Sequence, residues 1–288
     1  PGDLYRELEQ SFAYDETKWQ AKAINEVVDD LTSDQPMDRL ICGDVGYGKT
    51  EVAARAAFKA IEDGYQVAIL VPTTVLAEQH AATFRERFAS FPVEIACLNR
   101  FRTAKQQKEI AAALSAGSID LVVGTHRLLS KDILFNKLGL LIVDEEHRFG
   151  VTHKEKIKKI KAAVDVLTLT ATPIPRTLQM SLLGIRDLSV ISTPPQQRRS
   201  VKSFCARYDQ LVIREAVLRE LERGGQLFFV HNRVQSIHRM ADTIASLVPQ
   251  ARIGVAHGQM LGPQLEEIMV RFINHDLDIL VCTTILES

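Results

Sequence analysis

Short aliphatic runs, each bounded by turn signals or polar residues, recur along the first two thirds of the chain. Stretches of helical period lie between several of them, such as TEVAARAAFKAIEDG at 50–64 and TVLAEQHAATFRERF at 74–88. Apolar strands that alternate with amphipathic helices predict an α/β fold, with a mainly parallel sheet covered by helices on both faces. The expected strands are RLICGD at 39–44, QVAILVP at 66–72, VEIACL at 93–98, DLVVGT at 120–125, LGLLIVDE at 138–145 and VLTLTA at 166–171.

A second series of strand-like runs follows a break in this pattern. The break is STPPQQRRS at 192–200, where a Pro pair and a polar, basic run cannot continue a strand or a helix. We therefore expect one α/β domain at 1–194 and a second at 195–288, whose sheet stops after four strands and is incomplete. The four runs are VKSFCA at 201–206, QLFFVH at 226–231, RIGVAH at 252–257 and DILVCT at 278–283.

Composition limits the class of protein more than it indicates a function. With 288 residues, of which 46% are hydrophobic, the chain is long enough for two domains with buried cores. The net charge of −1 does not decide whether the protein binds a polyanion, because basic residues can gather on one face. No charged-then-apolar leader opens the sequence and no apolar run approaches ~20 residues, so neither secretion nor membrane spanning is indicated. The chain begins at Pro1 without Met and ends at Ser288 directly after a strand, which indicates a piece of a longer protein.

The four cysteines lie far apart, each within an apolar run, and they form no C-x-x-C pair. Buried free thiols are therefore favoured over a disulfide or a zinc site, and this cysteine usage suits a cytoplasmic protein. His147 and His153 do not indicate a zinc site either, because no cysteine or carboxylate spacing completes the ligand set. The cysteines are Cys42, Cys97, Cys205 and Cys282.

The stretch GDVGYGKT at 43–50 fits the phosphate-loop pattern G-x-x-x-x-G-K-[ST] between an expected strand and an expected helix. Glycines let backbone N–H groups turn inward around phosphate oxygens, and the helix adds the positive end of its dipole. We expect Lys49 to reach the β- and γ-phosphates of ATP and to act in catalysis, and Thr50 to bind Mg²⁺. The expected nucleotide-binding residues of this stretch are Gly43, Asp44, Val45, Gly46, Tyr47, Gly48, Lys49, Thr50 and Glu51.

The stretch LIVDEEHRFG at 141–150 places three carboxylates in a row at the end of an expected strand. Taken alone, this pattern is equally compatible with a solvated strand end. With a phosphate loop on a neighbouring strand, Asp144 is expected to hold Mg²⁺ and Glu145 to act as the general base that polarises the attacking water. Mg²⁺ with ATP is the only metal that the sequence supports.

Six motifs, spread over essentially the whole chain, together resemble those of the superfamily 2 helicases and translocases. They are most similar to the motifs of the transcription-repair coupling factors, and the RecG-type fork helicases are closely related. DEEH, where RecG proteins typically have DEQH, and Glu51 after GKT favour the first group. The resemblance implies two RecA-like P-loop domains with mainly parallel sheets flanked by helices, the second truncated. The motifs are GDVGYGKTEVA at 43–53, VPTTVLAEQH at 71–80, GTHRLL at 124–129, DEEHRFGV at 144–151, TLTATPIPRTL at 168–178 and AHGQM at 256–260.

The resemblance also assigns roles to residues outside the phosphate loop. Gln20 occupies the place of the adenine-reading Q motif, and Phe12 either stacks on the base or packs in the core. A further set is implied to couple hydrolysis to movement of the lobes, and its arginine faces either DNA or the other lobe. These coupling residues are His147, Thr170, Thr172 and Arg176.

The resemblance implies sequence-independent contacts with double-stranded DNA at strand ends, where hydroxyls, backbone N–H groups and basic residues hold phosphates. For Thr73 alone a helix N-cap is the commoner explanation, and the family placement reverses that preference. The basic run HKEKIKKIKA at 153–162 is more typical of a solvated helix face than of DNA binding. The implied DNA-facing residues are Thr73, Arg100, Arg102, Thr125 and His126 in the first domain and Asn232, Arg233, His257, Gly258, Thr283 and Thr284 in the second.

Three functions stay open. The first is the ATP-driven translocase motor of transcription-coupled repair, whose full-length parent contacts RNA polymerase and UvrA through modules absent from this chain. The second is a RecG-type fork or junction helicase, and the third is a nucleotide-binding scaffold without turnover. The family's later motif, whose arginines reach the γ-phosphate, is absent, so we expect this chain to bind ATP or ADP but to hydrolyse ATP poorly.

Overall fold

The computed structural model describes residues 2–171, 186–195 and 201–284. The chain divides into two compact units, Pro1–Ser200 and Val201–Ser288, whereas the sequence indicated a boundary between residues 194 and 195. In the described part of the chain, no helix is long and apolar enough to cross a membrane.

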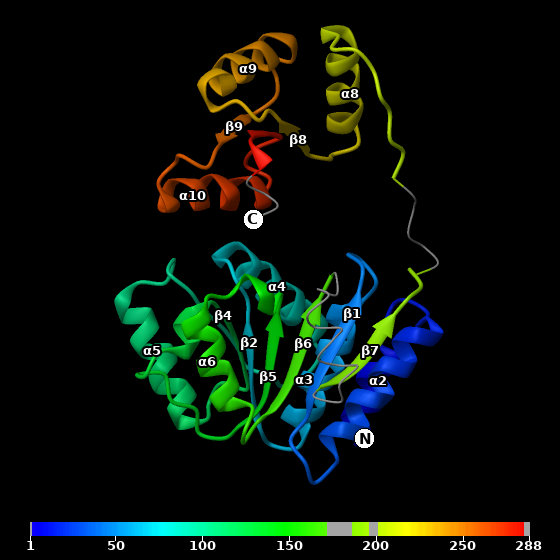
Figure 1. Ribbon diagram of the computed structural model, residues 1–288, viewed down its shortest axis with the longest axis vertical. Coiled ribbons are helices and arrows are strands. Elements are labelled where there is room, and N and C mark those ends of the chain that lie inside the picture. The colour runs from blue at the N-terminus through cyan, green and yellow to red at the C-terminus, as the bar shows by residue number, and fades with distance from the viewer. Residues whose placement is uncertain (1, 172–185, 196–200, 285–288) are drawn as a thin grey trace. The chain divides into compact units, whose positions relative to one another are not determined.

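The first unit is built on a seven-stranded, entirely parallel sheet with the order β3-β4-β2-β5-β6-β1-β7 (Figure 1). Six of the strands match the aliphatic runs of the sequence to within two residues at each end. The strands are β1 (Asp38–Gly43), β2 (Gln66–Leu70), β3 (Ile95–Leu98), β4 (Leu121–Gly124), β5 (Leu138–Asp144), β6 (Asp165–Thr170) and β7 (Asp187–Ile191).

Helices cover both faces of this sheet, which confirms the expected α/β architecture. Along β2, Val67 and Ile69 pack in the cluster that contains the first four helices, while Ala68 and Leu70 pack in the cluster of the opposite face. This alternation is the period of two that a strand buried on both faces requires. One face carries α1 (Asp3–Gln10), α2 (Lys18–Leu31), α3 (Lys49–Glu62) and α4 (Thr74–Arg87), and the other carries α5 (Ala104–Ala116) and α6 (Val151–Ile160).

Parallel strands bring their carboxyl ends to one edge of the sheet, and the sequence motifs follow those ends. The phosphate loop follows β1, Asp144 ends β5, and Thr73 and Thr125 follow β2 and β4. One expectation was wrong: the strand that carries Asp144 does not neighbour the phosphate-loop strand, because β6 pairs with both β5 and β1 and lies between them. The end of β6 therefore lies between the phosphate loop and the acidic residues.

The second unit has a three-stranded parallel sheet with the order β8-β10-β9. The helices α8 and α9 share a core with one face of β10, through Ile279 and Val281, and α10 packs on the other face, through Leu280 and Cys282. The elements are α8 (Gln210–Glu222), β8 (Leu227–Val230), α9 (Val234–Leu247), β9 (Ile253–Ala256), α10 (Gly262–Ile273) and β10 (Ile279–Cys282).

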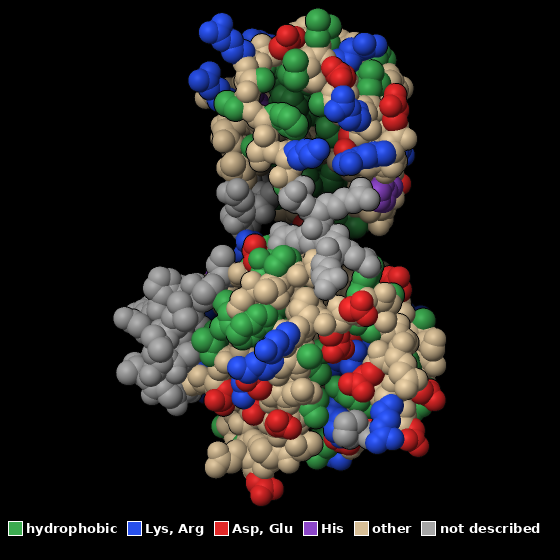
Figure 2. Space-filling model, turned by 90° about the vertical axis from the view of Figure 1, so that its right-hand side faces the viewer, with side chains coloured by type: hydrophobic (Ala, Val, Ile, Leu, Met, Phe, Trp, Pro, Cys, Tyr) green, Lys and Arg blue, Asp and Glu red, His purple; other side chains and the backbone are tan. Residues whose placement is uncertain are grey.

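The strand expected at 201–206 is wrong. These residues have no regular structure, and the side chain of Phe204 is 89% exposed. A strand needs a partner for its backbone N–H and C=O groups, and no described strand pairs with this run. The thiol of Cys205 is consequently exposed, contrary to expectation, while the other three cysteines are free and buried as expected. Figure 2 shows hydrophobic side chains on the surface of this second unit.

Candidate functional site

The phosphate loop joins β1 to α3, and two of its glycines have backbone conformations that other residues rarely adopt. Gly46 has φ 76° and Gly48 has φ 85°, both in the left-handed region. A Cβ atom added to Gly48 would lie 2.1 Å from the Nε2 atom of Gln20, so the end of that side chain would have to shift. Gly43, the last residue of β1, is held against Ile191 of β7.

Lys49, the first residue of α3, turns its ammonium group back over the loop. Its Nζ donates to the carbonyl oxygens of Gly43 at 2.6 Å and Asp44 at 3.1 Å. Burial lowers the pKa of Lys49, and the negative charges of Asp144 and Glu145 oppose that shift. The basic group and the two acidic residues therefore interact electrostatically, although Lys49 begins the helix after β1 and the acids lie at the end of β5, which does not pair with β1.

Asp144, at the end of β5, has a partner that sequence reasoning missed. The Oδ2 atom of Asp144 lies 2.9 Å from the Nε2 atom of His80 on α4, and both side chains are largely buried. His80 is the last residue of the motif VPTTVLAEQH, so the motif contained the histidine but gave no sign that it contacts the acid.

Glu145 is held in a conformation that costs a non-glycine residue about 1–2 kcal/mol. Its backbone has φ 52°, in the left-handed region, and its N–H donates to the carbonyl of Leu169 on β6. One carboxylate oxygen accepts from the N–H of Ala171 at 3.0 Å, and the other lies 3.1 Å from Nδ1 of His147. The end of β6 and His147 thus fix the carboxylate at the edge of the sheet.

The next acid, Glu146, is committed to an ion pair within the first unit. Its carboxylate accepts from Arg186 at 3.0 Å. Burial alone would raise the pKa of Glu146, but Lys161 and Arg186 more than offset burial and hold it below its ordinary value. Three adjacent carboxylates therefore have three different environments, with His80 beside Asp144, a backbone N–H and His147 at Glu145, and cationic side chains around Glu146.

A cavity of about 620 Å³ opens beside the phosphate loop. Gly48 and Thr50 of the loop line it, and so do Phe12 and Gln20, the two residues that the resemblance assigns to the base. Phe12 is half-buried, lines the cavity and does not belong to the hydrophobic core clusters, and base stacking by Phe12 stays a prediction. The amide of Gln20 is buried and doubly used, because its oxygen accepts from Thr17 N–H and its Nε2 donates to the carbonyl of Tyr47.

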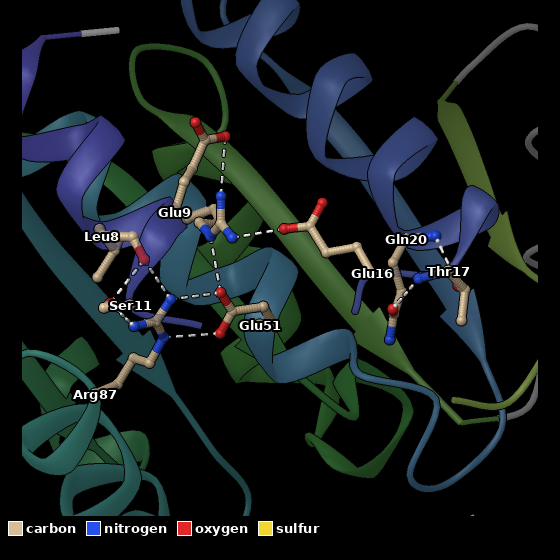
Figure 3. Close-up of polar contacts among 9 residues, drawn as sticks. Leu8, Glu9, Ser11, Glu16, Thr17, Gln20, Glu51 and Arg87 are labelled. Carbon is tan, nitrogen blue, oxygen red and sulfur yellow. Dashed lines mark hydrogen bonds and ion pairs between the residues drawn. The ribbon is translucent and has the colours of Figure 1, made fainter. Parts of the chain in front are cut away.

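An ionic network (Figure 3) includes two residues that line this cavity, Glu51 and Arg87. Arg55 on α3, with only 1% of its side chain exposed, pairs with Glu9 at 3.0 Å, Glu16 at 2.5 Å and Glu51 at 2.8 Å. Arg87 on α4 donates to the same Glu51 at 2.8 Å. Glu51, expected to bind nucleotide, is thus a carboxylate that joins two helices and lines the cavity.

Some of the DNA-facing residues expected in the first unit already make hydrogen bonds within the protein. Thr73 caps α4, because its hydroxyl accepts from Leu76 N–H at 3.2 Å, as the commoner explanation of an isolated Thr predicts. Arg102 donates to the carboxylate of Glu78 at 2.9 Å and to the carbonyl of Cys97 at 3.2 Å. Thr125 is buried at the end of β4, directly before a short 3-10 helix at His126–Leu129.

His126 belongs to a cluster of basic side chains at the same edge. Its ring lies 5.3 Å from the ring of His153 on α6, and burial lowers the pKa of His126, helped by His153, Arg100 and Lys156. The basic run at 153–162, which the sequence favoured as a solvated helix face, therefore contributes two groups to the neighbourhood of His126. Thr170 is buried at the end of β6, whereas Thr172 and Arg176 lie outside the described residues.

In the second unit the expected DNA-facing residues also follow strand ends. Asn232 accepts from the N–H of Thr284 at 3.2 Å, which joins the segments after β8 and β10. The Nδ1 atom of His257 is buried without a hydrogen-bond partner among the described residues, and its ring lies 5.9 Å from that of His238. Arg233, Gly258 and Thr283 occupy the same strand-end segments, and Thr283 N–H donates to Ala256 of β9.

Comparisons with known proteins agree with this arrangement. Residues 17–181 match the DEAD/DEAH box helicase family. The chain is 58% identical to the transcription-repair-coupling factor of Bacillus subtilis (strain 168) and 55% identical to that of Escherichia coli (strain K12), in each case over 286 residues. These matches cover 99% of the chain but only 24% and 25% of those two proteins.

Solved structures show the same likeness. The chain resembles RecG bound to a three-way DNA junction with a TM-score of 0.80 and 35% identity, over 99% of this chain and 38% of that one. It resembles the DUF1998 helicase MrfA bound to DNA with a TM-score of 0.69 and 16% identity, over 99% of this chain and 45% of that one. The second likeness concerns the fold alone.

Proposed function

Because the chain belongs to the DEAD/DEAH box helicase family, we propose that it is the ATP-driven motor of a double-stranded DNA translocase that acts in transcription-coupled repair. The observation that carries the proposal is that the phosphate loop, Asp144 and Glu145 lie at one edge of the sheet, with a cavity lined by Gly48 and Thr50 beside the loop. The chain spans about a quarter of the length of these two relatives. We therefore propose that it carries the motor part of the full-length protein's activity.

The nucleotide-binding part of the proposal has two halves. The loop N–H groups, Lys49 and the amino end of α3 receive the phosphates, since all three present positive charge or donors. Phe12 and the cavity receive the base by stacking and exclusion of water. The Thr50 hydroxyl and the Asp144 carboxylate are oxygen donors of the kind Mg²⁺ prefers. When bound, that ion neutralises charge on the β- and γ-phosphates.

Hydrolysis is proposed to use Glu145 as the base that orients and polarises a water molecule. The N–H of Ala171 and the ring of His147 fix the two carboxylate oxygens, so the base cannot rotate freely. Because Ala171 follows β6 directly, a change at the end of that strand would reorient the base. This contact gives the coupling role proposed for His147 and Thr170 a physical route.

The DNA-binding part rests on the strand ends of both units. Thr73 and His126 in the first unit and the segments after β8, β9 and β10 in the second offer hydroxyls, N–H groups and imidazoles. Such groups hold phosphates without reading the base sequence. We therefore propose sequence-independent binding of double-stranded DNA, with Arg100, Arg102 and the basic cluster around His126 adding positive charge.

Nucleotide binding by the chain itself is the first test. A fluorescent ATP analogue with Mg²⁺ should bind with a Kd in the micromolar range, and Lys49→Ala should weaken that binding at least about tenfold through loss of a half-buried cation. Lys22→Ala, on the exposed surface of α2, is the matched control. Equal affinity for all three proteins would contradict the assigned phosphate site.

Turnover separates a motor from a nucleotide-binding scaffold. The full-length protein is a protein that contains this chain and has the length of the coupling factors. It should hydrolyse ATP faster when duplex DNA is added. Glu145→Gln should retain nucleotide binding and lose at least about a hundredfold in turnover. A scaffold would keep its cellular function in the Glu145→Gln variant.

A RecG-type junction helicase is the second candidate, favoured by the structural likeness to RecG at 35% identity. The higher identity to the coupling factors favours the first candidate. We propose RNA polymerase and UvrA as partners of the full-length protein. Release of a stalled RNA polymerase by that protein would support the first candidate, whereas regression of a model fork without polymerase release would support the second.

A further inference from the structure

The helix α4 carries residues that belong to three separate parts of the proposed motor. Thr73 at its amino cap, His80 in its middle and Arg87 at its carboxyl end follow one another at intervals of seven residues. Seven residues make about two helical turns and about 10 Å of rise, so these positions lie on nearly one side of the helix. A single rigid element therefore links the proposed DNA edge, the acid at β5 and the cavity.

The middle contact joins α4 to the proposed Mg²⁺ ligand. The Nε2 atom of His80 lies 2.9 Å from Asp144 Oδ2, and the exposed fractions of the two side chains are 12% and 15%. Of the two neighbours of His80 along the helix, Gln79 is exposed to solvent and Ala81 packs in the core. Movement of α4 along its axis would thus change the orientation of the Asp144 carboxylate directly.

The end contact joins α4 to the cavity (Figure 3). Arg87 donates to Glu51 of α3, to the hydroxyl of Ser11 at 2.7 Å and to the carbonyl of Leu8 at 2.9 Å. Its guanidinium carbon lies 5.4 Å from the centroid of the Phe12 ring, close enough for a cation–π contact. Arg87 thereby fixes the end of α1 and the side chain proposed to stack on the base.

We propose that α4 couples DNA bound at its amino end to both halves of the nucleotide site, with His80 positioning Asp144 and Arg87 positioning Phe12. This inference rests on the proposed function, since it needs both ATP and DNA as ligands. Neither side chain touches the reacting atoms; each acts through the residue it holds. One helix carries all three positions, so movement of that helix can transmit the coupling. The coupling is also reciprocal: DNA must change the affinity for nucleotide by the same factor by which nucleotide changes the affinity for DNA.

The test of the middle contact measures the affinity of the chain for a fluorescent Mg²⁺–ATP analogue with and without duplex DNA. DNA should change the affinity of the unsubstituted chain at least about fivefold, the lower end of usual allosteric couplings. His80→Leu should reduce that change to less than about twofold. His80→Gln, whose Nε2 replaces that of histidine, should restore most of it, and Gln79→Ala on the exposed side of α4 should leave it intact.

The test of the end contact compares ATP with base-free tripolyphosphate. Arg87→Met should weaken ATP binding about tenfold by misplacing Phe12, while the affinity for tripolyphosphate should stay within about twofold. Arg85→Met, an exposed arginine on the same helix, is the control. An equal loss for both ligands would overturn the role of Arg87.

The outcomes separate this inference from the proposed function. If the unsubstituted chain fails to bind Mg²⁺–ATP, the proposed function is wrong. If it binds Mg²⁺–ATP but DNA leaves the affinity unchanged, or if His80→Leu keeps the full DNA effect, the coupling through α4 is wrong and the nucleotide site stands.

Discussion

Arg55 gives the sharpest prediction about how the site is supported. Its guanidinium lies among the carboxylates of Glu9, Glu16 and Glu51, which come from α1, the segment before α2, and α3. Replacing Arg55 by Met keeps an unbranched, apolar stem of similar reach but removes the cation. The three carboxylates would then repel one another, and the segment that carries Phe12 would lose its attachment to α3.

The magnitude follows from burial. Removing one partner of a fully buried ion pair destabilises a protein by about 3–5 kcal/mol. Arg55 is 1% exposed, but Glu9 and Glu16 are 46% and 28% exposed, so water screens part of their charge. Glu51 also keeps Arg87 as a partner. We therefore expect Arg55→Met to lower the free energy of unfolding of the first unit by about 3 kcal/mol, at the lower end of that range.

Urea unfolding followed by tryptophan fluorescence measures this loss. Trp19 is the only tryptophan of the chain and lies in α2, so its emission follows the first unit alone. Arg6→Met is the control, because its pair with Asp3 is 67% and 99% exposed and should contribute less than about 0.5 kcal/mol. A loss below about 1 kcal/mol for Arg55→Met, or one equal to the control, would refute the structural role of the network.

Three further predictions concern other parts of the chain. Gly48→Ala should weaken Mg²⁺–ATP binding at least about tenfold, because the left-handed backbone is strained and the new Cβ would clash with Gln20. Gly64→Ala, at φ 78° with open space around it, should only strain the backbone, by about 1–2 kcal/mol. Nucleotide titration and urea unfolding distinguish the two variants. Cys205 should be alkylated by iodoacetamide first, and Cys97, whose pKa burial raises to about 11, last; peptide mass spectrometry after timed quenching gives the order. Burial would raise the pKa of Glu146, but Lys161 and Arg186 lower it below 4.5. The contribution of Glu146 to stability is therefore present above pH 4.5 and is lost as the pH falls through the lowered pKa. Glu146→Gln should reduce this loss of stability in acid, which urea unfolding at pH 3–6 measures.

Local patterns predicted most of the first unit. The phosphate loop was identifiable because its glycines, its lysine and its hydroxyl are adjacent in the chain, between a strand and a helix. The acids after β5 were identifiable because an aliphatic run ends abruptly in Asp144. The strand β7 was missed, since DLSVI stands close to the Pro pair that dominated the interpretation.

Contacts between distant residues could not be predicted in this way. His80 and Asp144 are 64 positions apart, and Arg87 and Leu8 are 79 positions apart, so no periodicity relates them. The place of β6 between β5 and β1 is likewise a property of the folded sheet. The error at 201–206 has the opposite origin: the run has the composition of a strand, but pairing decides whether a strand forms.

The central claim is that the phosphate loop and Glu145 drive movement along duplex DNA, and displacement of a third DNA strand tests it most directly. The full-length protein is loaded on a duplex that carries a triplex-forming oligonucleotide, and release of the oligonucleotide is followed after ATP is added. Release by the unsubstituted protein with ATP, and none by Glu145→Gln at equal DNA occupancy, is the predicted result. Equal release by the two proteins, or none by the unsubstituted protein while it hydrolyses ATP, would contradict the claim.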